Sequence, residues 1–154
     1  MERSSEKFKK ILERLKLKVD IITFEESTKT SQQAANCLKI DVAQIGKSIV
    51  FKTQSRKFIM VITSGVNSVN EQKIEQEIQE KLEKTNGNEI KEYIGFPIGG
   101  IPPFGHDNHL TLFLDEDLLK FNEIYCAAGT PNTVFAINPR KLLEITKSKV
   151  LCVK

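Results

Sequence analysis

One lysine of the chain lies in a setting where an ammonium group could take part in chemistry. Side chains alternate across a β-strand, so a strand through residue 47 places Lys47 on one face with three apolar neighbours, Ile45, Ile49 and Phe51. An unpaired lysine is rarely buried in a protein core. If this face borders a pocket, Lys47 can hold a phosphate or polarise a carbonyl. If the residue lies at the strand end, its ammonium only reaches water.

A twelve-residue segment, 95–106, is the second candidate. It contains four of the eight glycines and three of the five prolines, a content that excludes a helix interior or a central strand. Its large apolar side chains make it unsuitable as a solvated linker, so we expect a stiff, partly buried loop. Such a loop either lines a binding site or only fills the core.

Backbone groups of this loop are the candidate binding atoms. Gly99 and Gly100 can take positive φ and let a ligand approach the backbone. The Pro-Pro pair that follows fixes φ and holds Ile101 extended. Free N–H groups on Gly99, Gly100 and Gly105 could then hold a carbonyl or phosphate oxygen.

The two histidines, His106 and His109, are three residues apart. Gly105 and the nearby prolines disfavour the helix that would bring them to one face, and catalytic zinc takes three protein ligands, so we expect no metal. We expect His106 to form a hydrogen-bonding wall of the pocket and His109 to lie on the surface.

Covalent and nucleotide chemistry find no support in the motifs. Ser48, Ser64 and Thr130 lack a Gly-x-Ser-x-Gly setting and an obvious base. The chain has no Walker loop, and no Gly-x-Gly-x-x-Gly opens a helix after a strand, so we expect no cofactor.

Cysteine spacing and hydropathy suggest where the protein works. The three cysteines, Cys37, Cys126 and Cys152, form no Cys-x-x-Cys pair, which fits a reducing cytoplasm. No apolar run approaches the ~20 residues that span a bilayer. The first residues also lack the apolar core of a signal peptide. We therefore expect a cytoplasmic protein without membrane association.

The candidate residues must be positioned by about six to seven strands and several helices. We expect strands at 20–24, 47–53, 57–63, 110–114, 124–127 and 133–137. We expect helices at 4–17, 89–93, 118–121 (after Asp115) and 139–147. Two more helices are expected to follow capping boxes, one at Thr30–Gln33 and one at Ser68–Glu71. The second of these carries the apolar stripe Ile74, Ile78 and Leu82.

These elements predict an α/β (mixed α+β) fold in a single domain, residues 1–154. Some strands are apolar on both faces, which requires cover on both sides. The sequence therefore favours either a covered mixed sheet or a distorted closed β-barrel, surrounded by helices.

Charge is concentrated at the two ends of the chain. Residues 1–18 and residues 140–154 each carry a net charge of +4, so the middle sums to −5. Basic ends on an acidic body could bind an acidic partner such as RNA. Alternatively, lysine-rich terminal helices only keep the protein soluble.

Five motifs in a fixed order connect the chain to a known family. They are an Ala34-Ala35 helix, the strand 45–51 (IGKSIVF), the loop 95–105 (GFPIGGIPPFG), a strand that ends in Asp115, and Ala127-Ala128-Gly129. In this order they resemble the YbaK/EbsC family, which is similar to the editing domain inserted in bacterial prolyl-tRNA synthetases. The resemblance runs from about Phe24 to Ile145.

The resemblance implies a mixed α/β fold around a distorted barrel. It also implies a freestanding hydrolase that cleaves the ester of a mischarged aminoacyl-tRNA carrying a small amino acid. It gives catalytic roles to Lys47 and to the Gly-x-x-x-Pro loop, here Gly99, Gly100 and Pro103. The residues expected to contact substrate are Ile101, Phe104, Gly105, His106, Gly129, Thr30 and Ser48.

Two further positions bear on the resemblance. Asp115 matches a family position, although helix capping explains it equally well. The Pro-Pro-Phe-Gly-His sequence that ends in His106 implies a substrate other than cysteinyl-tRNA.

The implied chemistry agrees with the residue types. An aminoacyl ester is already activated, so the site has to position a water and stabilise the developing oxyanion, without an attacking side chain. Lys47 would hold the 3′-terminal phosphate or the carbonyl side of the substrate. Pocket volume, set by loop side chains, would admit small amino acids. The expected partners are the acceptor end of aminoacyl-tRNA and, as a further candidate, an aminoacyl-tRNA synthetase.

Two other interpretations stay open. The chain could be a non-catalytic module that binds tRNA or a synthetase through its basic ends. It could also hydrolyse a different small ester or amide.

Overall fold

The computed structural model describes residues 4–154, in which five α-helices, two short 3-10 helices and eight strands form. In chain order the elements are α1 (Ser4–Arg14), β1 (Ile21–Thr23), α2 (Ser31–Leu38), η1 (Val42–Gln44), β2 (Ile45–Thr53), β3 (Phe58–Ser64), α3 (Glu71–Ile78), β4 (Leu82–Glu83), α4 (Gly87–Ile94), β5 (Thr111–Asp115), η2 (Glu116–Lys120), β6 (Ile124–Ala127), β7 (Thr133–Ile137), α5 (Pro139–Thr146) and β8 (Lys149–Leu151).

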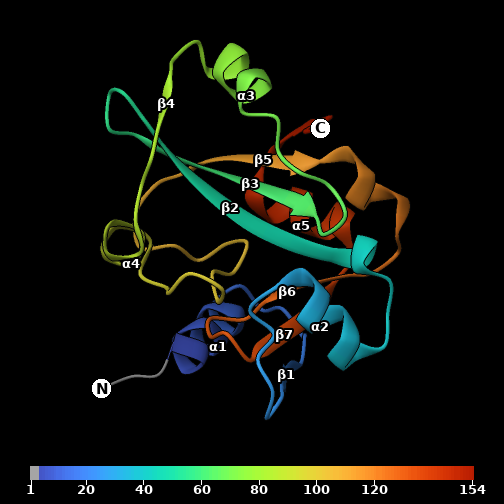
Figure 1. The fold of residues 1–154 in the computed structure, drawn as a ribbon. Coiled ribbons are helices and arrows are strands. Elements are labelled where there is room, and N and C mark those ends of the chain that lie inside the picture. The colour runs from blue at the N-terminus through green and yellow to red at the C-terminus, as the bar shows by residue number, and fades with distance from the viewer. Residues whose placement is uncertain (1–3) are drawn as a thin grey trace.

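The eight strands form one mixed sheet in the order β1-β7-β6-β2-β3-β5-β8, and β4 pairs with the end of β2. β2 is antiparallel to β3 and parallel to β6, and β3 is parallel to β5. Figure 1 shows β1, β6 and β7 beside α1 and α2, at the opposite end of the view from α3. The mixed α/β fold that the sequence predicts is confirmed.

The sheet does not close into a barrel. Among the described residues, its terminal strands β1 and β8 each have one partner, β7 and β5, and they do not pair with each other. Each of them is only three residues long. The covered mixed sheet is therefore the correct alternative of the two that the sequence allowed.

Strand β3 is buried along its whole length and separates two apolar cores. Met60 and Ile62 face the larger core, which includes side chains of α1, β6, β7 and α5. Ile59 and Val61 face a smaller core that contains Ile74 of α3. A strand with apolar residues on both faces requires this cover on both sides.

Two α-helices, α2 and α5, begin at the capping residues that the sequence predicts. The Thr30 hydroxyl accepts from Gln33 N–H while the Gln33 side chain accepts from Thr30 N–H, a complete capping box before α2. Asn138 caps α5, and Pro139 occupies its first turn. Both predictions are confirmed, although α5 ends at Thr146 and not at residue 147.

Three predicted boundaries of α1 and α3 are also wrong. The apolar spacing predicts a helix over 4–17, yet α1 ends at Arg14, because Lys16 takes a φ of 57° and Leu17 N–H donates to the Leu12 carbonyl. The helix α3 begins after Asn70, and not after Ser68, because the Asn70 side chain accepts from Gln72 N–H.

The third error concerns the end of α3. The helix ends at Ile78 because Gln79 takes a φ of 57°, so Leu82 lies outside the predicted helical stripe. Leu82 instead pairs with Thr53 in β4. With two and three residues, β4 and β8 are too short to show a periodic pattern, and the sequence did not predict them.

The buried face of α1 supports the glycine- and proline-rich loop. Phe8 is fully buried, and its ring centroid lies 6.5 Å from that of Phe96 and 5.3 Å from that of Phe104, both in the loop. It also lies 5.0 Å from the ring of Phe135 in β7. One side chain of α1 therefore connects the loop to the sheet.

We expect Phe8→Ala to lower the free energy of unfolding by about 3–5 kcal/mol, because it leaves a cavity among three aromatic rings. Urea unfolding followed by circular dichroism measures the change. The matched control is Leu15→Ala, because Leu15 follows the same helix but is 47% exposed. We expect the control to change stability by less than about 1 kcal/mol. Equal losses in the two variants would contradict the assigned role of Phe8.

Candidate functional site

A cavity of about 210 Å³ lies where the start of α2, strand β2, the glycine- and proline-rich loop and strands β6 and β7 meet. Lys47 and Ser48 line it from β2, and Thr30 and Ser31 line it from the start of α2. Apolar side chains form much of the remaining wall: Ala34, Ile45, Ile49, Ile98, Ile101, Ala127 and Val134.

The cavity exists because β2 and β6 pair over only two residues. Ile45 of β2 pairs with Tyr125 of β6, and Gly46 pairs with Cys126. Strand β6 pairs with β7 along its whole length, whereas β2 separates from β6 after Gly46. A side chain at position 46 would meet Cys126 Sγ at 2.9 Å, so the glycine permits this close approach. Beyond it, residues 47–51 of β2 pair with β3 alone among the described residues, which leaves room beside the strand.

The loop is fixed at both of its ends. Asp107 N–H donates to the Ile94 carbonyl at 2.9 Å and closes the loop at its base. Lys7 of α1 donates to the Gly95 carbonyl at 3.1 Å and forms an ion pair with Asp107 at 2.8 Å. The same ammonium lies 4.6 Å from the centre of the Phe96 ring. A compact loop with joined ends is a rigid wall for a site.

Within the loop, the adjacent glycines serve two different purposes. Gly99 takes a φ of 86° in a turn that the Gly100 N–H closes by donating to the Pro97 carbonyl at 3.0 Å. Gly100 has to be small because a Cβ there would lie 2.6–2.8 Å from backbone atoms of Thr130. The N–H of Gly100 is thus used inside the turn, and the prediction that it is free is wrong.

The mouth of the cavity is positively charged. Lys29 and Lys47 both line it, and within residues 4–154 neither ammonium has a carboxylate within ion-pair distance. The side chain of Lys29 packs over Gly99, where a Cβ would meet its Cγ at 2.5 Å. The described lining residues include no aspartate or glutamate. This charge pattern suits a ligand with an anionic group or a polarised carbonyl.

The structure brings five of the predicted site residues to this cavity. They are Lys47, Ser48, Thr30, Gly99 and Ile101. Lys47 is exposed at the mouth, and Ile101 is buried in the loop. The Thr30 hydroxyl accepts from the helix backbone, which leaves its own proton free to be donated.

The other predicted site residues lie outside the lining of this cavity. Phe104 packs between Phe8 and Phe135 in the core, and Pro103 is buried. Gly100 faces Thr130, and Gly129 faces the backbone of Ser4, 2.5 Å from where a Cβ would stand. Gly105 and His106 line a separate hollow beside α1, together with Phe104.

Two further lining residues, Lys29 and Ser31, were not among the predicted site residues. Both follow from the position of the capping box, because Thr30 is the N-cap and its two neighbours must lie at the same helix end. Cys126 was also missed as a lining residue. Burial raises the pKa of the Cys126 thiol to about 12, so it is protonated at neutral pH and does not supply a thiolate nucleophile.

The described residues form neither a metal-binding cluster nor a helix that could span a membrane. Residues 4–154 contain no group of three His, Cys, Asp or Glu side chains close enough to hold a metal ion. No helix in this range combines the length and apolar character that crossing a bilayer requires.

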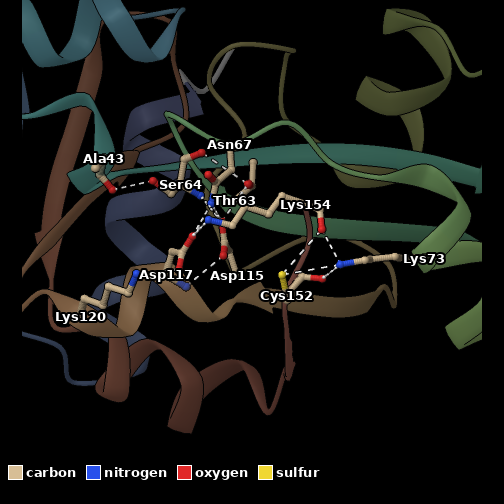
Figure 2. Close-up of polar contacts among 10 residues, drawn as sticks. All are labelled: Ala43, Thr63, Ser64, Asn67, Lys73, Asp115, Asp117, Lys120, Cys152 and Lys154. Atoms are coloured by element: carbon tan, nitrogen blue, oxygen red, sulfur yellow. Dashed lines mark hydrogen bonds and ion pairs between the residues drawn. The ribbon is translucent and has the colours of Figure 1, made fainter.

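Asp115 has a structural environment, shown in Figure 2. Its buried carboxylate accepts from the Thr63 hydroxyl at 3.1 Å, from Ser64 N–H at 2.9 Å and from the Asn67 amide at 2.8 Å. It also accepts from Asp117 N–H at 3.0 Å, which caps η2 as the sequence predicts. Four donors joining β3, β5 and η2 account for a buried carboxylate at this position.

Asp117 binds the last residue, Lys154, next to the Asp115 cluster. It forms ion pairs with Lys120 at 3.0 Å and with Lys154 at 3.1 Å (Figure 2). A hydrogen bond from Asn67, followed by those from Lys120 and Lys154, lowers the pKa of Asp117. This cluster therefore stabilises the sheet and does not contribute to the cavity around Lys47.

Comparison with known proteins identifies the family. The sequence model of the aminoacyl-tRNA editing domain family matches residues 25–145, which is most of the chain. The chain belongs to the aminoacyl-tRNA editing domain family. This finding confirms the resemblance to YbaK-like proteins that the motifs indicate.

Individual relatives agree with the family match. The editing-domain chain is 30% identical over 131 residues to the uncharacterized protein YwhH of Bacillus subtilis (strain 168), covering 85% of this chain and 83% of YwhH. It is 32% identical over 90 residues to the proline–tRNA ligase of Bacillus licheniformis, covering 58% of this chain and 16% of the ligase. The match to the ligase thus involves a small part of that enzyme.

A solved structure has the same fold over the whole chain. A protein proposed to be a trans-editing enzyme for prolyl-tRNA synthetase superposes with a TM-score of 0.93 at 32% sequence identity. The superposition covers 100% of this editing-domain chain and 98% of the other.

His106 generates a testable dependence of stability on pH. Its Nε2 lies 2.7 Å from the Pro102 carbonyl, and burial lowers the pKa of His106 below its usual value. In the window just below about pH 6.5, the unfolded chain therefore binds more protons than the folded one, so stability falls as the pH falls.

We expect wild-type protein to lose stability between about pH 7.5 and about pH 5.5, and His106→Gln to lose less. Glutamine can donate to the Pro102 carbonyl but does not titrate in this range. Urea midpoints at a series of pH values measure both slopes. Identical slopes in the two proteins would show that His106 stays at its ordinary pKa in the fold.

Proposed function

We propose that this protein is a freestanding aminoacyl-tRNA deacylase that removes a small amino acid from mischarged tRNA. The observation that carries the proposal is the ammonium of Lys47, which has no carboxylate partner within residues 4–154 and lies at the mouth of the cavity that Gly99 also lines. Membership of the editing-domain family and similarity to part of a proline–tRNA ligase support aminoacyl-tRNA as the substrate class.

The proposed reaction uses water as the nucleophile. The water oxygen attacks the ester carbonyl carbon, and the bond from that carbon to the ribose oxygen breaks. The ribose oxygen takes up a proton, so the products are a free amino acid and uncharged tRNA. A protein nucleophile is unnecessary because the ester is already activated. The protonated Cys126 thiol in the cavity fits this route.

In this proposal the loop stabilises the developing oxyanion, and Lys47 binds the phosphate of the substrate. The Gly99 N–H is available for the developing oxyanion, because no hydrogen-bond partner for it exists among the described residues. The Gly100 N–H supports the turn instead. Lys47 and Lys29 at the mouth attract the phosphate of the terminal nucleotide. Apolar side chains deeper in the cavity enclose the amino acid side chain and limit its size.

A panel of mischarged tRNAs tests the proposal. We expect ester loss from at least one small aminoacyl-tRNA, and a reduction of about 100-fold in kcat/KM for Lys47→Ala. The matched control is Lys91→Ala, an exposed lysine on α4 outside the cavity. Full activity of Lys47→Ala, or no turnover on any substrate of the panel, would reject the proposed mechanism.

A non-catalytic tRNA-binding module is the second candidate, and the basic surface of α1 favours it. Lys9, Lys10 and Arg14 are exposed on this helix. If they contact the acceptor stem, binding releases counterions and weakens as salt rises. The same surface would also serve a deacylase by holding its substrate.

We expect simultaneous neutralisation of Lys9, Lys10 and Arg14 to raise KM for tRNA about 10-fold and to flatten its salt dependence. The matched control neutralises three other exposed lysines, Lys57, Lys84 and Lys91, with the same change in net charge. Tight, salt-dependent binding without ester loss would favour the non-catalytic module. A KM that equals wild type in the α1 variant excludes RNA contact by this helix.

A further inference from the structure

Two buried hydroxyl groups of the cavity have nothing to bond to. Within the described chain, three buried side-chain oxygens lack a hydrogen-bond partner: Ser31 Oγ, Ser48 Oγ and Thr85 Oγ1. The two serines both line the cavity, whereas Thr85 does not. Buried polar atoms in folded proteins nearly always have partners, so this concentration at one place needs an explanation.

The fold does not require hydroxyl groups at these two positions. Thr30, and not Ser31, caps α2, and a side-chain hydroxyl contributes no backbone pairing to β2 at Ser48. Alanine is the best helix former in the first turn of α2, and in a strand interior it costs at most about 1 kcal/mol. A group that enters the cavity can supply the missing hydrogen bonds.

The charges around the cavity restrict what that group is. An amino acid side chain that ends in an ammonium would meet Lys29 and Lys47 and no carboxylate among the described lining residues, so its entry is unfavourable. A charged side chain of the substrate would also be costly against the apolar wall formed by residues such as Ala34 and Val134. A neutral hydroxyl matches both conditions, because it can donate to one serine and accept from the other.

We propose that Ser31 and Ser48 select a hydroxyl-bearing amino acid, serine or threonine, over alanine. This inference rests on the proposed function, since it assumes that the aminoacyl end of tRNA occupies the cavity. Sites built to bond a substrate hydroxyl discriminate strongly against the analogue that lacks it, because their polar groups then stay unpaired.

Binding of stable analogues tests the selectivity separately from catalysis. The probes are 3′-amino-3′-deoxyadenosines that carry a seryl, threonyl or alanyl group through an amide bond, and titration calorimetry measures Kd. We expect wild-type protein to bind the seryl probe about 10-fold more tightly than the alanyl probe. In Ser31→Ala and Ser48→Ala, we expect this ratio to fall toward one.

Thr85→Ala is the matched control, because it removes the third unpartnered oxygen, outside the cavity. We expect it to keep the wild-type ratio. Neither serine variant should melt at a lower temperature than wild type, since neither loses a hydrogen bond. A marked fall in melting temperature would assign the hydroxyls to the fold and overturn the inference.

The outcomes separate this inference from the proposed function. Equal binding of the seryl and alanyl probes overturns the selectivity, even if the protein deacylates both esters. Preferential binding of the seryl probe that both serine variants abolish supports the selectivity, even if no ester is hydrolysed. In that second case only the proposed catalysis fails.

Discussion

The separation of β2 from β6 is the constraint on which the site depends. The two strands lie side by side only at Ile45 and Gly46, where the glycine lets Cys126 approach closely. Beyond Gly46, β2 separates from β6, which stays paired with β7, and the free flank of β2 becomes one wall of a cavity. Lys47 pairs with β3 on one flank, and on the other flank it has no strand partner among the described residues, so a ligand can approach it there.

The loop completes the cavity because it cannot easily move. Lys7 bonds to both ends of the loop, and the Phe8 ring supports its middle. The proposed oxyanion donor at Gly99 is therefore held in place before a substrate arrives. Such preorganisation makes electrostatic stabilisation effective without a covalent intermediate.

The sequence predicted the fold class, most of the strands and the position of Lys47, because these depend on local periodicity. It failed where two local signals competed, as with the Asn70 cap that replaces Ser68. It also overestimated the number of loop residues around the cavity. Phe104 and Gly105 belong to the motif, yet they pack against α1, and only the distant contacts of that helix reveal it.

The position of Phe8 also bears on the order in which parts of the molecule fold. Its partners, Phe96, Phe104 and Phe135, come from the second half of the chain. An isolated helix of 11 residues such as α1 is marginal in water. We therefore expect α1 to dock after the loop and β7 are in place, and closing so long a segment of chain slows this step. On this expectation the N-terminal helix joins late, onto a sheet that has already begun to form.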